Sequence, residues 1–335
     1  MKVLVTGSVG FIGSALTLRL LERGDYVVGI DNHNNYYDPL LKEARLSRQI
    51  NHQNYTHIRI DIEDKKAVED LFNSHHFDGV VNLAAQAGVR YSINNPLAYI
   101  NTNIVGFGHI LEGCRHSKVA HLVYASSSSV YGSNTKIPYS INDNVDHPMS
   151  IYAASKKANE LMAHAYSNLY DLPTTGLRFF TVYGPWSRPD MALFKFTKSI
   201  LAGEKIQVFN NGKHRRDFTY IDDVVEAMIR VLDKPASSNL NWDSNYPTAG
   251  TSKSPWRIYN IGNTTPIELL EYIQAIEDAL GLEADKEFLS LQLGDMPNTF
   301  ANVDDLVNEF DYKPSMPVNR GVSNFVKWYK TFYKI

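Results

Sequence analysis

Cysteine is nearly absent from this sequence: Cys114 is the single cysteine among 335 residues, so no intramolecular disulfide can form. A lone thiol suits a reducing compartment. The eleven histidines show no spacing with cysteine that resembles a zinc site, and we predict no bound metal. The sequence also lacks an apolar stretch long enough to cross a bilayer, and residues 1–6 lack the basic start and long apolar run of a secretory signal. We therefore predict a cytoplasmic protein without a membrane partner.

An excess of charge of one sign is missing as well. The chain has 33 basic and 36 acidic residues, which leaves a formal net charge of −3. This balance gives no reason to expect nucleic acid as a partner, so an anionic ligand must be met by a few local arginines. Hydrophobic residues make up 44% of the chain, which is ordinary for a globular protein with a buried core.

Short apolar runs alternate with amphipathic segments in the first half of the chain. The apolar runs predict strands, and the amphipathic segments predict helices. The strands are expected over residues 3–6, 26–31, 57–62, 79–85 and 121–127, and helices over residues 11–23, 65–74, 96–115 and 152–170. Strands without polar alternation, separated by helices, are typical of a parallel sheet covered on both faces. The sequence therefore predicts an α/β fold with a doubly wound, Rossmann-type parallel sheet.

The second half of the chain is richer in loops. We expect residues 181–335 to form a smaller C-terminal lobe that closes over the open end of the sheet. Residues 237–256 have the polar composition of an exposed insertion, and the apolar run over residues 257–263 is expected to return one strand to the sheet.

A glycine-rich turn lies between the first strand and the first helix. Gly7, Gly10 and Gly13, with Phe11 and Ile12 between them, permit a tight turn and close approach of the backbone to a pyrophosphate at the helix N-terminus. Such a glycine pattern alone is weak evidence, because a structural turn without a ligand is an alternative explanation. Here a strand precedes it and a helix follows it, as a dinucleotide site requires.

Acidic residues at the ends of the second and third strands extend this site. A carboxylate at Asp31 accepts hydrogen bonds from ribose hydroxyls and repels a 2′-phosphate, which favours NAD over NADP, although a helix cap is the alternative reading. Asp61 is placed to reach the adenine amine. The predicted cofactor site also includes the neighbours of these residues and the end of the fourth strand: Asn32, Ile62, Leu83, Ala84 and Ala85.

Tyr152 and Lys156 are candidates for proton transfer. Their spacing of four residues puts the phenol and the ammonium on one helix face, where the positive charge is expected to lower the pKa of Tyr152. Alone, such a pair is more typical of a solvated helix face than of a catalytic site. However, the strand over residues 121–127 runs into four consecutive serines (residues 126–129) at its carboxyl end, the edge where doubly wound sheets bind ligands.

Together, the glycine turn, the serine cluster and the Tyr152/Lys156 pair resemble the extended short-chain dehydrogenase/reductase family, in the group that acts on nucleotide-linked sugars. The similarity runs from residue 1 to about residue 311. It implies that Tyr152 takes a proton from a sugar hydroxyl while NAD takes the hydride, and that Lys156 steadies the phenolate and the nicotinamide ribose. Ser127 matches the hydroxyl that binds the reacting oxygen. Residues 1–180 would then be the NAD-binding domain, and residues 181–335 mainly the UDP-sugar lobe, with some segments returning to the first domain.

The residues after Ser127 distinguish between reactions of that family. Relatives that eliminate water carry an Asp-Glu pair there, and nucleotide-sugar decarboxylases carry a glutamate. This chain has Ser128 and Ser129 instead, so hydride removal and return, which is epimerisation, is what remains.

Several stretches resemble the UDP-glucuronate 4-epimerase branch: residues 36–38, 41–46, 84–92, 177–186 and 188–192. The resemblance implies interconversion of UDP-glucuronate and UDP-galacturonate. Thr181 stands where most relatives carry asparagine, and its small hydroxyl suits a sugar carboxylate. Arg90 and Arg188 are candidate counter-charges for that carboxylate, with surface ion pairs as the alternative. Arg216 matches the diphosphate-binding arginine of the family.

Two positions depart from the pattern of the branch, which usually has alanine in place of Val9 and glycine in place of Ser187. The second departure lies beside Arg188 and leaves the sugar preference open. The alternative functions are a UDP-glucose/UDP-galactose 4-epimerase, a decarboxylase or dehydratase, an alcohol dehydrogenase that turns over external NAD, and a non-catalytic NAD-binding protein.

Related enzymes pair through two long helices, so we expect a homodimer built on residues 96–115 and 152–170.

Overall fold

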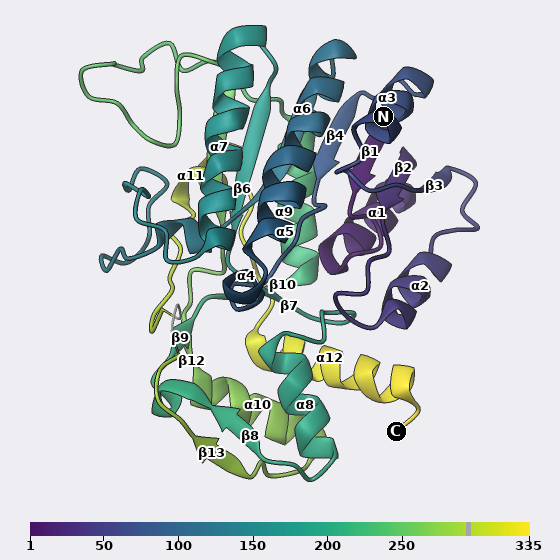
Figure 1. Cartoon of the computed structure of the whole chain (residues 1–335). Coiled ribbons are helices and arrows are strands. Elements are labelled where there is room, and N and C mark those ends of the chain that lie inside the picture. The colour runs from purple at the N-terminus through teal and green to yellow at the C-terminus, as the bar shows by residue number, and fades with distance from the viewer. Residues whose placement is uncertain (293–295) are drawn as a thin grey trace.

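The computed structural model describes residues 1–292 and 296–335. Its central sheet has seven strands, all parallel, in the order β11-β6-β5-β4-β1-β2-β3 (Figure 1). These strands are β1 (Lys2–Thr6), β2 (Tyr26–Asp31), β3 (Tyr55–Arg59), β4 (Gly79–Asn82), β5 (His121–Ser127), β6 (Thr174–Phe179) and β11 (Trp256–Ile261).

Helices cover both faces of this sheet. On one face lie α3 (Lys65–Ser74), α6 (Phe107–His116) and α7 (Ile151–Tyr170), and on the other lie α1 (Phe11–Arg23) and α9 (Ile221–Asp233). Side chains of β1 alternate between the two cores, with Leu4 facing α3 and α6, and Val3 facing α1. Cys114 of α6 is fully buried in the first of these cores. The predicted doubly wound α/β fold is confirmed.

The remaining elements are short or belong to the second half of the chain. They are α2 (Pro39–Ser47), α4 (Tyr91–Asn94), α5 (Pro96–Tyr99), β7 (Thr181–Tyr183), α8 (Ala192–Leu201), β8 (Ile206–Val208), β9 (Arg215–Arg216), β10 (Phe218–Tyr220), β12 (Ile267–Glu268), α10 (Leu269–Leu280), β13 (Lys286–Phe288), α11 (Asp304–Phe310) and α12 (Val318–Tyr333). Figure 1 shows α8, α10, α12, β8 and β13 gathered beyond the end at which the central strands finish. No helix in the described residues combines the length and the apolar composition that crossing a bilayer requires.

The predicted return strand is present as β11, which pairs in parallel with β6. The loop before it is largely exposed over residues 237–249, as predicted, with Leu240 at 88% and Tyr246 at 82% exposure. The end of the predicted insertion is different, because Ser252 and Ser254 are buried and Trp256 begins the strand. The exposed part of the insertion is therefore shorter than the polar composition indicated.

Two strands end earlier than predicted. The fourth was expected to reach Ala85 but ends at Asn82. The Leu83 amide still donates to the Thr6 carbonyl oxygen (3.3 Å), whereas the Ala84 amide donates to the Thr6 hydroxyl (2.9 Å). The third was expected over residues 57–62 but covers Tyr55–Arg59. Its neighbour β2 ends at Asp31, whose carbonyl oxygen accepts from the Ile60 amide (3.2 Å), so the residues beyond Ile60 have no strand to pair with.

The long helix predicted over residues 96–115 is not uniformly α-helical. It consists of α5, a π-helical segment over Ile100–Gly106, and α6. The wider turn places the Asn103 side chain against the loop after β4, where Asn103 Oδ1 accepts from the Gln86 amide (2.8 Å). A π-helical segment beside a ligand-binding loop is a common arrangement at functional sites.

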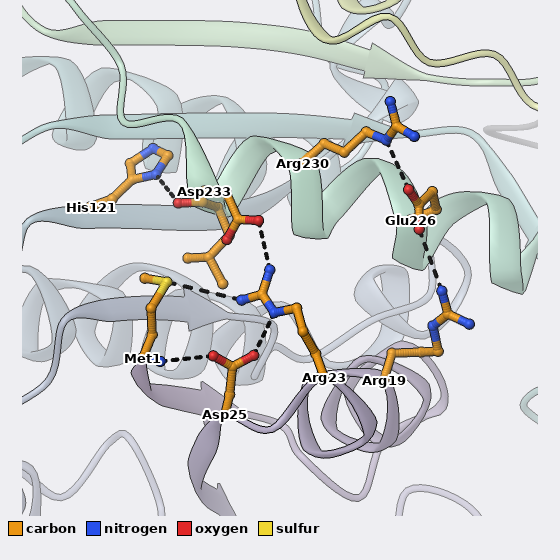
Figure 2. Close-up of polar contacts among 9 residues, drawn as sticks. Met1, Arg19, Arg23, Asp25, His121, Glu226, Arg230 and Asp233 are labelled. Atoms are coloured by element: carbon orange, nitrogen blue, oxygen red, sulfur yellow. Dashed lines mark hydrogen bonds and ion pairs between the residues drawn. The ribbon is translucent and has the colours of Figure 1, made fainter.

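Arginine and carboxylate side chains join α1 to α9 at the end of the sheet where the strands begin. Figure 2 shows Arg23 between Asp25 and Asp233, with N–O distances of 2.6 Å to each. It also shows Glu226 accepting from Arg19 and Arg230, at 3.4 and 2.8 Å. Because these pairs are partly exposed, each contributes little to stability on its own.

His121 in the same region should make stability depend on pH. It is buried between the Leu232 carbonyl oxygen (3.2 Å) and the Thr175 hydroxyl (2.8 Å), and burial lowers its pKa to about 4. The unfolded chain therefore binds the proton more tightly, so stability should fall as the pH drops from 6.5 to 4. The full effect is about 3 kcal/mol. Urea unfolding of wild type and His121→Asn across this range measures it, and parallel pH profiles for the two proteins would refute this role.

Candidate active site

The carboxyl ends of the central strands and the elements beyond them enclose one large cavity of about 1080 Å³. Every residue that the sequence predicted for the site lines it. They are Gly7, Gly10, Phe11, Ile12, Gly13, Asp31, Asn32, Asp61, Ile62, Leu83, Ala84, Ala85, Arg90, Ser127, Ser128, Ser129, Tyr152, Lys156, Thr181, Arg188 and Arg216. The fold thus brings together residues that are up to about 200 positions apart in the chain.

The glycine turn leaves no room for side chains. Gly7 has a φ of +68°, and a Cβ built on it would lie 2.9 Å from the Ala84 nitrogen. A Cβ on Gly13 would lie 2.0 Å from the carbonyl oxygen of Gly7. Gly10 precedes α1 without a side-chain cap, so the first amides of that helix are available to an anion. This cradle fits the pyrophosphate of a dinucleotide.

The two predicted acidic residues, Asp31 and Asp61, line the same cavity as the glycine turn. Asp31 ends β2, where its carboxylate accepts from the His33 amide (2.8 Å). Asp61 does not close β3 as predicted but lies in the turn beyond it, where it accepts from Asn32 Nδ2 (2.8 Å). Lys42 was given no role by the sequence, although its buried ammonium lies 3.8 Å from Asp31 Oδ1. The sequence signal that could have identified Lys42 was its position on one face of α2.

Tyr152 and Lys156 lie in the first turns of α7, which begins where the Ser150 hydroxyl caps it by accepting from the Ala153 amide (3.1 Å). Burial raises the pKa of Tyr152, and a hydrogen bond with Ser127 opposes that shift. Burial also lowers the pKa of Lys156 to about 8. The predicted lowering of the Tyr152 pKa is wrong in this structure, because burial raises it; Lys156 Nζ donates to the Ala125 carbonyl oxygen (2.9 Å).

The serine cluster forms the turn that follows β5. Ser127 Oγ accepts from the Ser129 amide (3.2 Å), and residues Ser128–Tyr131 form a short 3-10 helix. The Ser126 hydroxyl donates to Glu160 (2.6 Å). All four serines line the cavity, and Ser126 in addition ties the turn to α7 through Glu160.

A buried ion pair holds this turn to α7. Arg178 of β6 donates to both carboxylate oxygens of Glu160 at 2.8 and 2.9 Å, and the two side chains are 1% and 2% exposed. Burial acts to raise the pKa of Glu160, but the charge and hydrogen bonds of Arg178 and the Ser126 hydroxyl lower it overall. This pair was not among the residues predicted for the site. A glutamate four residues after Lys156, on the buried face of the helix, was the available signal.

The arginines predicted for the sugar have different surroundings. Arg188 donates to both oxygens of Asp190 at 2.9 and 2.7 Å, so it forms an ion pair, but inside the cavity and not on the surface. Arg90 lies with its guanidinium 5.1 Å from the centre of the Phe209 ring. Arg216 Nη1 donates to the Pro297 carbonyl oxygen (2.9 Å). Thr181 begins β7, and its amide donates to the Asp217 carbonyl oxygen (3.2 Å).

A doubly wound sheet with this glycine cradle and a tyrosine–lysine pair in one cavity defines an extended short-chain dehydrogenase/reductase. Residues 3–262 match the NAD dependent epimerase/dehydratase family, and the chain belongs to that family. Within it, the chain is an isomerase of the NAD-dependent UDP-sugar 4-epimerase group.

Known proteins show how far this similarity extends. The chain is 55% identical to protein CapI of Staphylococcus aureus, with all of both chains covered. It is 46% identical to UDP-glucuronate 4-epimerase 1 of Arabidopsis thaliana over 99% of this chain and 77% of that protein. Among solved structures, it is similar to UDP-glucuronic acid 4-epimerase from Bacillus cereus in complex with UDP-glucuronic acid and NAD. That match has a TM-score of 0.87 and 30% identity, and it covers 99% of this chain and 100% of the other.

Proposed function

We propose that this protein interconverts UDP-glucuronate and UDP-galacturonate by oxidation and re-reduction at C4 of the sugar. The observation that carries the proposal is the hydroxyl-rich wall of the cavity, where Ser128 and Ser129 stand in place of the acids of dehydratases and decarboxylases. Thr181 and Arg188 line the same cavity. Hydroxyls and a guanidinium suit a carboxylate at C6, since both donate hydrogen bonds to it. The names of the Arabidopsis and Bacillus relatives support the same substrate.

The residues that would hold NAD follow from the shape of the cavity. The glycine turn and the start of α1 would bind the pyrophosphate, Asp31 the adenosine ribose, and Asp61 the adenine. Bound there, the nicotinamide supplies an acceptor and then a donor for the C4 hydride. Because each turnover returns the hydride, the reaction needs no external reductant.

Tyr152 is the proposed base for the C4 hydroxyl proton, and Ser127 the hydrogen-bond donor to the reacting oxygen. Since burial raises the pKa of Tyr152, cations in the cavity must favour its ionised form; the Arg188 charge acts in this direction. Lys156 lies one helical turn from Tyr152 in the same cavity, where it would hold the nicotinamide ribose of bound NAD.

The 4-keto sugar must turn about its diphosphate linkage to expose its other face before re-reduction. This intermediate is a β-keto acid and is prone to lose CO₂. Hydrogen bonds from Ser128, Ser129 and Thr181 to the carboxylate would keep it out of the alignment that decarboxylation needs. Arg216, which lines the cavity, would hold the diphosphate during the turn.

The test is incubation of the purified protein with UDP-glucuronate, without added reductant, followed by chromatographic separation of the products. We expect UDP-galacturonate with little NADH or CO₂. A UDP-pentose product would make the protein a decarboxylase, and conversion of UDP-glucose alone would make it an epimerase of neutral sugars. Net accumulation of NADH would indicate an alcohol dehydrogenase.

We also propose that the protein is a homodimer that pairs through α5, α6 and α7. Exposed leucines lie on α5 and α7: Leu97 is 69%, Leu161 59% and Leu169 66% exposed. Figure 1 shows α6 and α7 side by side on the same face of the sheet. Covering such side chains is favourable by about 25 cal/mol per Å² of apolar surface.

Leu161→Asp should therefore convert the dimer into a monomer of 37.9 kDa, because it places a charge within the apolar contact. Light scattering after size-exclusion chromatography measures the mass. Leu240→Asp is the matched control, since Leu240 is equally apolar and 88% exposed but lies in the loop before β11. A wild-type mass of one chain, or an unchanged mass for Leu161→Asp, would contradict the proposal.

A further inference from the structure

The side chain of Arg45, on α2, is fully buried and forms no ion pair with a carboxylate in the described part of the chain. Burial lowers its pKa, and the phenol of Tyr37, which accepts from Arg45 Nη1 at 2.6 Å, partly opposes this. A buried guanidinium without a carboxylate partner is costly to keep, because the charge loses its hydration. The hydrogen bonds that the guanidinium does make therefore point to a role for this side chain.

Arg45 joins two loops that are far apart in the sequence. Nη1 donates to the carbonyl oxygen of Val9 (3.2 Å), in the glycine turn. Nη2 donates to the carbonyl oxygens of Trp186 (2.7 Å) and Ser187 (3.5 Å), immediately before Arg188. Val9 and Ser187 are also the two positions at which the sequence departs from the pattern of the UDP-glucuronate 4-epimerase branch that it resembles. The guanidinium is rigid and planar, so the donor nitrogens that bond to the two loops stay at a fixed separation. This geometry suits a side chain that joins two loops.

The loop before Arg188 is held from its other side as well. Trp186 has a left-handed backbone with a φ of 66°, which is unfavourable for a bulky residue. Its ring lies 5.1 Å from Trp328 and 5.2 Å from Phe332 of α12, and the Arg48 guanidinium lies 4.7 Å from its centre. The ring is thus fixed to α12, and the backbone is fixed to the glycine turn through Arg45.

We propose that Arg45 is a positioning residue that holds the loop carrying Arg188 and Asp190 in register with the glycine turn. Any shift of the glycine turn on binding a dinucleotide passes through the Val9 carbonyl to the guanidinium, and from there to the backbone next to Arg188. Cofactor binding and placement of the sugar are therefore coupled through one side chain. The inference rests on the proposed function only for the choice of sugar substrate.

The test compares wild type with Arg45→Met, which keeps the length of the side chain and removes the donors. Hydrogen exchange of the amides in residues 184–191 is followed by mass spectrometry with NAD saturating and after NAD is removed. In wild type, NAD should slow this exchange at least about fivefold, and in Arg45→Met that difference should be lost. For UDP-glucuronate, kcat/KM should fall about 10- to 100-fold, mainly through a higher KM.

Arg48→Met is the matched control. It removes the same charge from the exposed end of α2 and touches the Trp186 ring, but donates to neither loop carbonyl, so NAD should still slow exchange in residues 184–191. If Arg45→Met does not fold, Tyr37→Phe removes the hydroxyl that fixes the guanidinium, and a partial loss of the NAD effect is expected. Equal NAD-dependent protection in wild type and Arg45→Met, or in Tyr37→Phe where that variant replaces it, overturns the inference. Failure of wild type to convert UDP-glucuronate overturns the proposed function and leaves the exchange result to decide the role of Arg45.

Discussion

Tyr152→Phe should lower the turnover of UDP-glucuronate by about 10²- to 10⁴-fold, because it removes the group proposed to carry the C4 hydroxyl proton. The cavity keeps its shape, since phenylalanine differs by one oxygen atom and the neighbouring Ser127 hydroxyl still has the Ser129 amide as a partner. The variant should also keep its NAD, because the glycine turn and Asp31 lie at the other end of the cavity. Initial rates and the absorbance of bound cofactor in the purified variant measure the two effects.

The control for this prediction is Tyr91→Phe, which removes a phenol oxygen from the wall of the same cavity. Turnover by this variant should remain within a few-fold of wild type. Because the base must be ionised, wild-type kcat/KM should rise with pH until Tyr152 has lost its proton, and burial shifts that point upward. Robust turnover by Tyr152→Phe would remove the phenol from the mechanism.

Arg178→Met should lower the free energy of unfolding by about 3 to 5 kcal/mol, because it leaves the Glu160 carboxylate buried without its counter-charge. In wild type, the lowered pKa of Glu160 gives stability that is present above the unfolded pKa and lost as the pH falls through the folded one. In the variant, burial should raise the pKa of Glu160. Protonation then relieves the buried charge, so the difference from wild type should shrink as the pH drops from 7.5 to 5.

Urea unfolding at these two pH values measures the effect, with the double variant Arg178→Met/Glu160→Leu as the control. Replacing both charges with apolar side chains of similar size should restore most of the lost stability. A loss below about 1 kcal/mol for the single variant would place this pair with ordinary surface ion pairs. An equal loss in the double variant would show that packing, and not the unpaired charge, is responsible.

Local sequence signals predicted the parts of the site that adjacent residues determine. The helix after the glycine turn begins at Phe11 and ends at Arg23 as predicted, and Gly24 caps it with a φ of 95°. The strand over residues 121–127 is present with the expected bounds, so the serine cluster could be placed at its carboxyl end. In each case the turn chemistry next to the element marks its end.

Features that depend on contacts distant in sequence could not be predicted in the same way. Just past the end of the fourth strand at Asn82, the Ala84 amide donates to the Thr6 hydroxyl, 78 positions away. Arg45 reaches the carbonyl of Trp186 across 141 positions, so its role is invisible without the fold. The spacing of Tyr152 and Lys156 gave their common helix face correctly, but not the Ala125 carbonyl that Lys156 contacts.

The burial of Cys114 has a practical consequence for spectroscopy. Its side chain has no exposed surface, and burial raises the pKa of the thiol, so it should not react with maleimides while the protein is folded. The natural chain is therefore a background on which one introduced cysteine carries a fluorophore alone. Placed at Phe288, which is 50% exposed on β13, such a label would report whether the elements beyond the sheet move when a UDP-sugar enters.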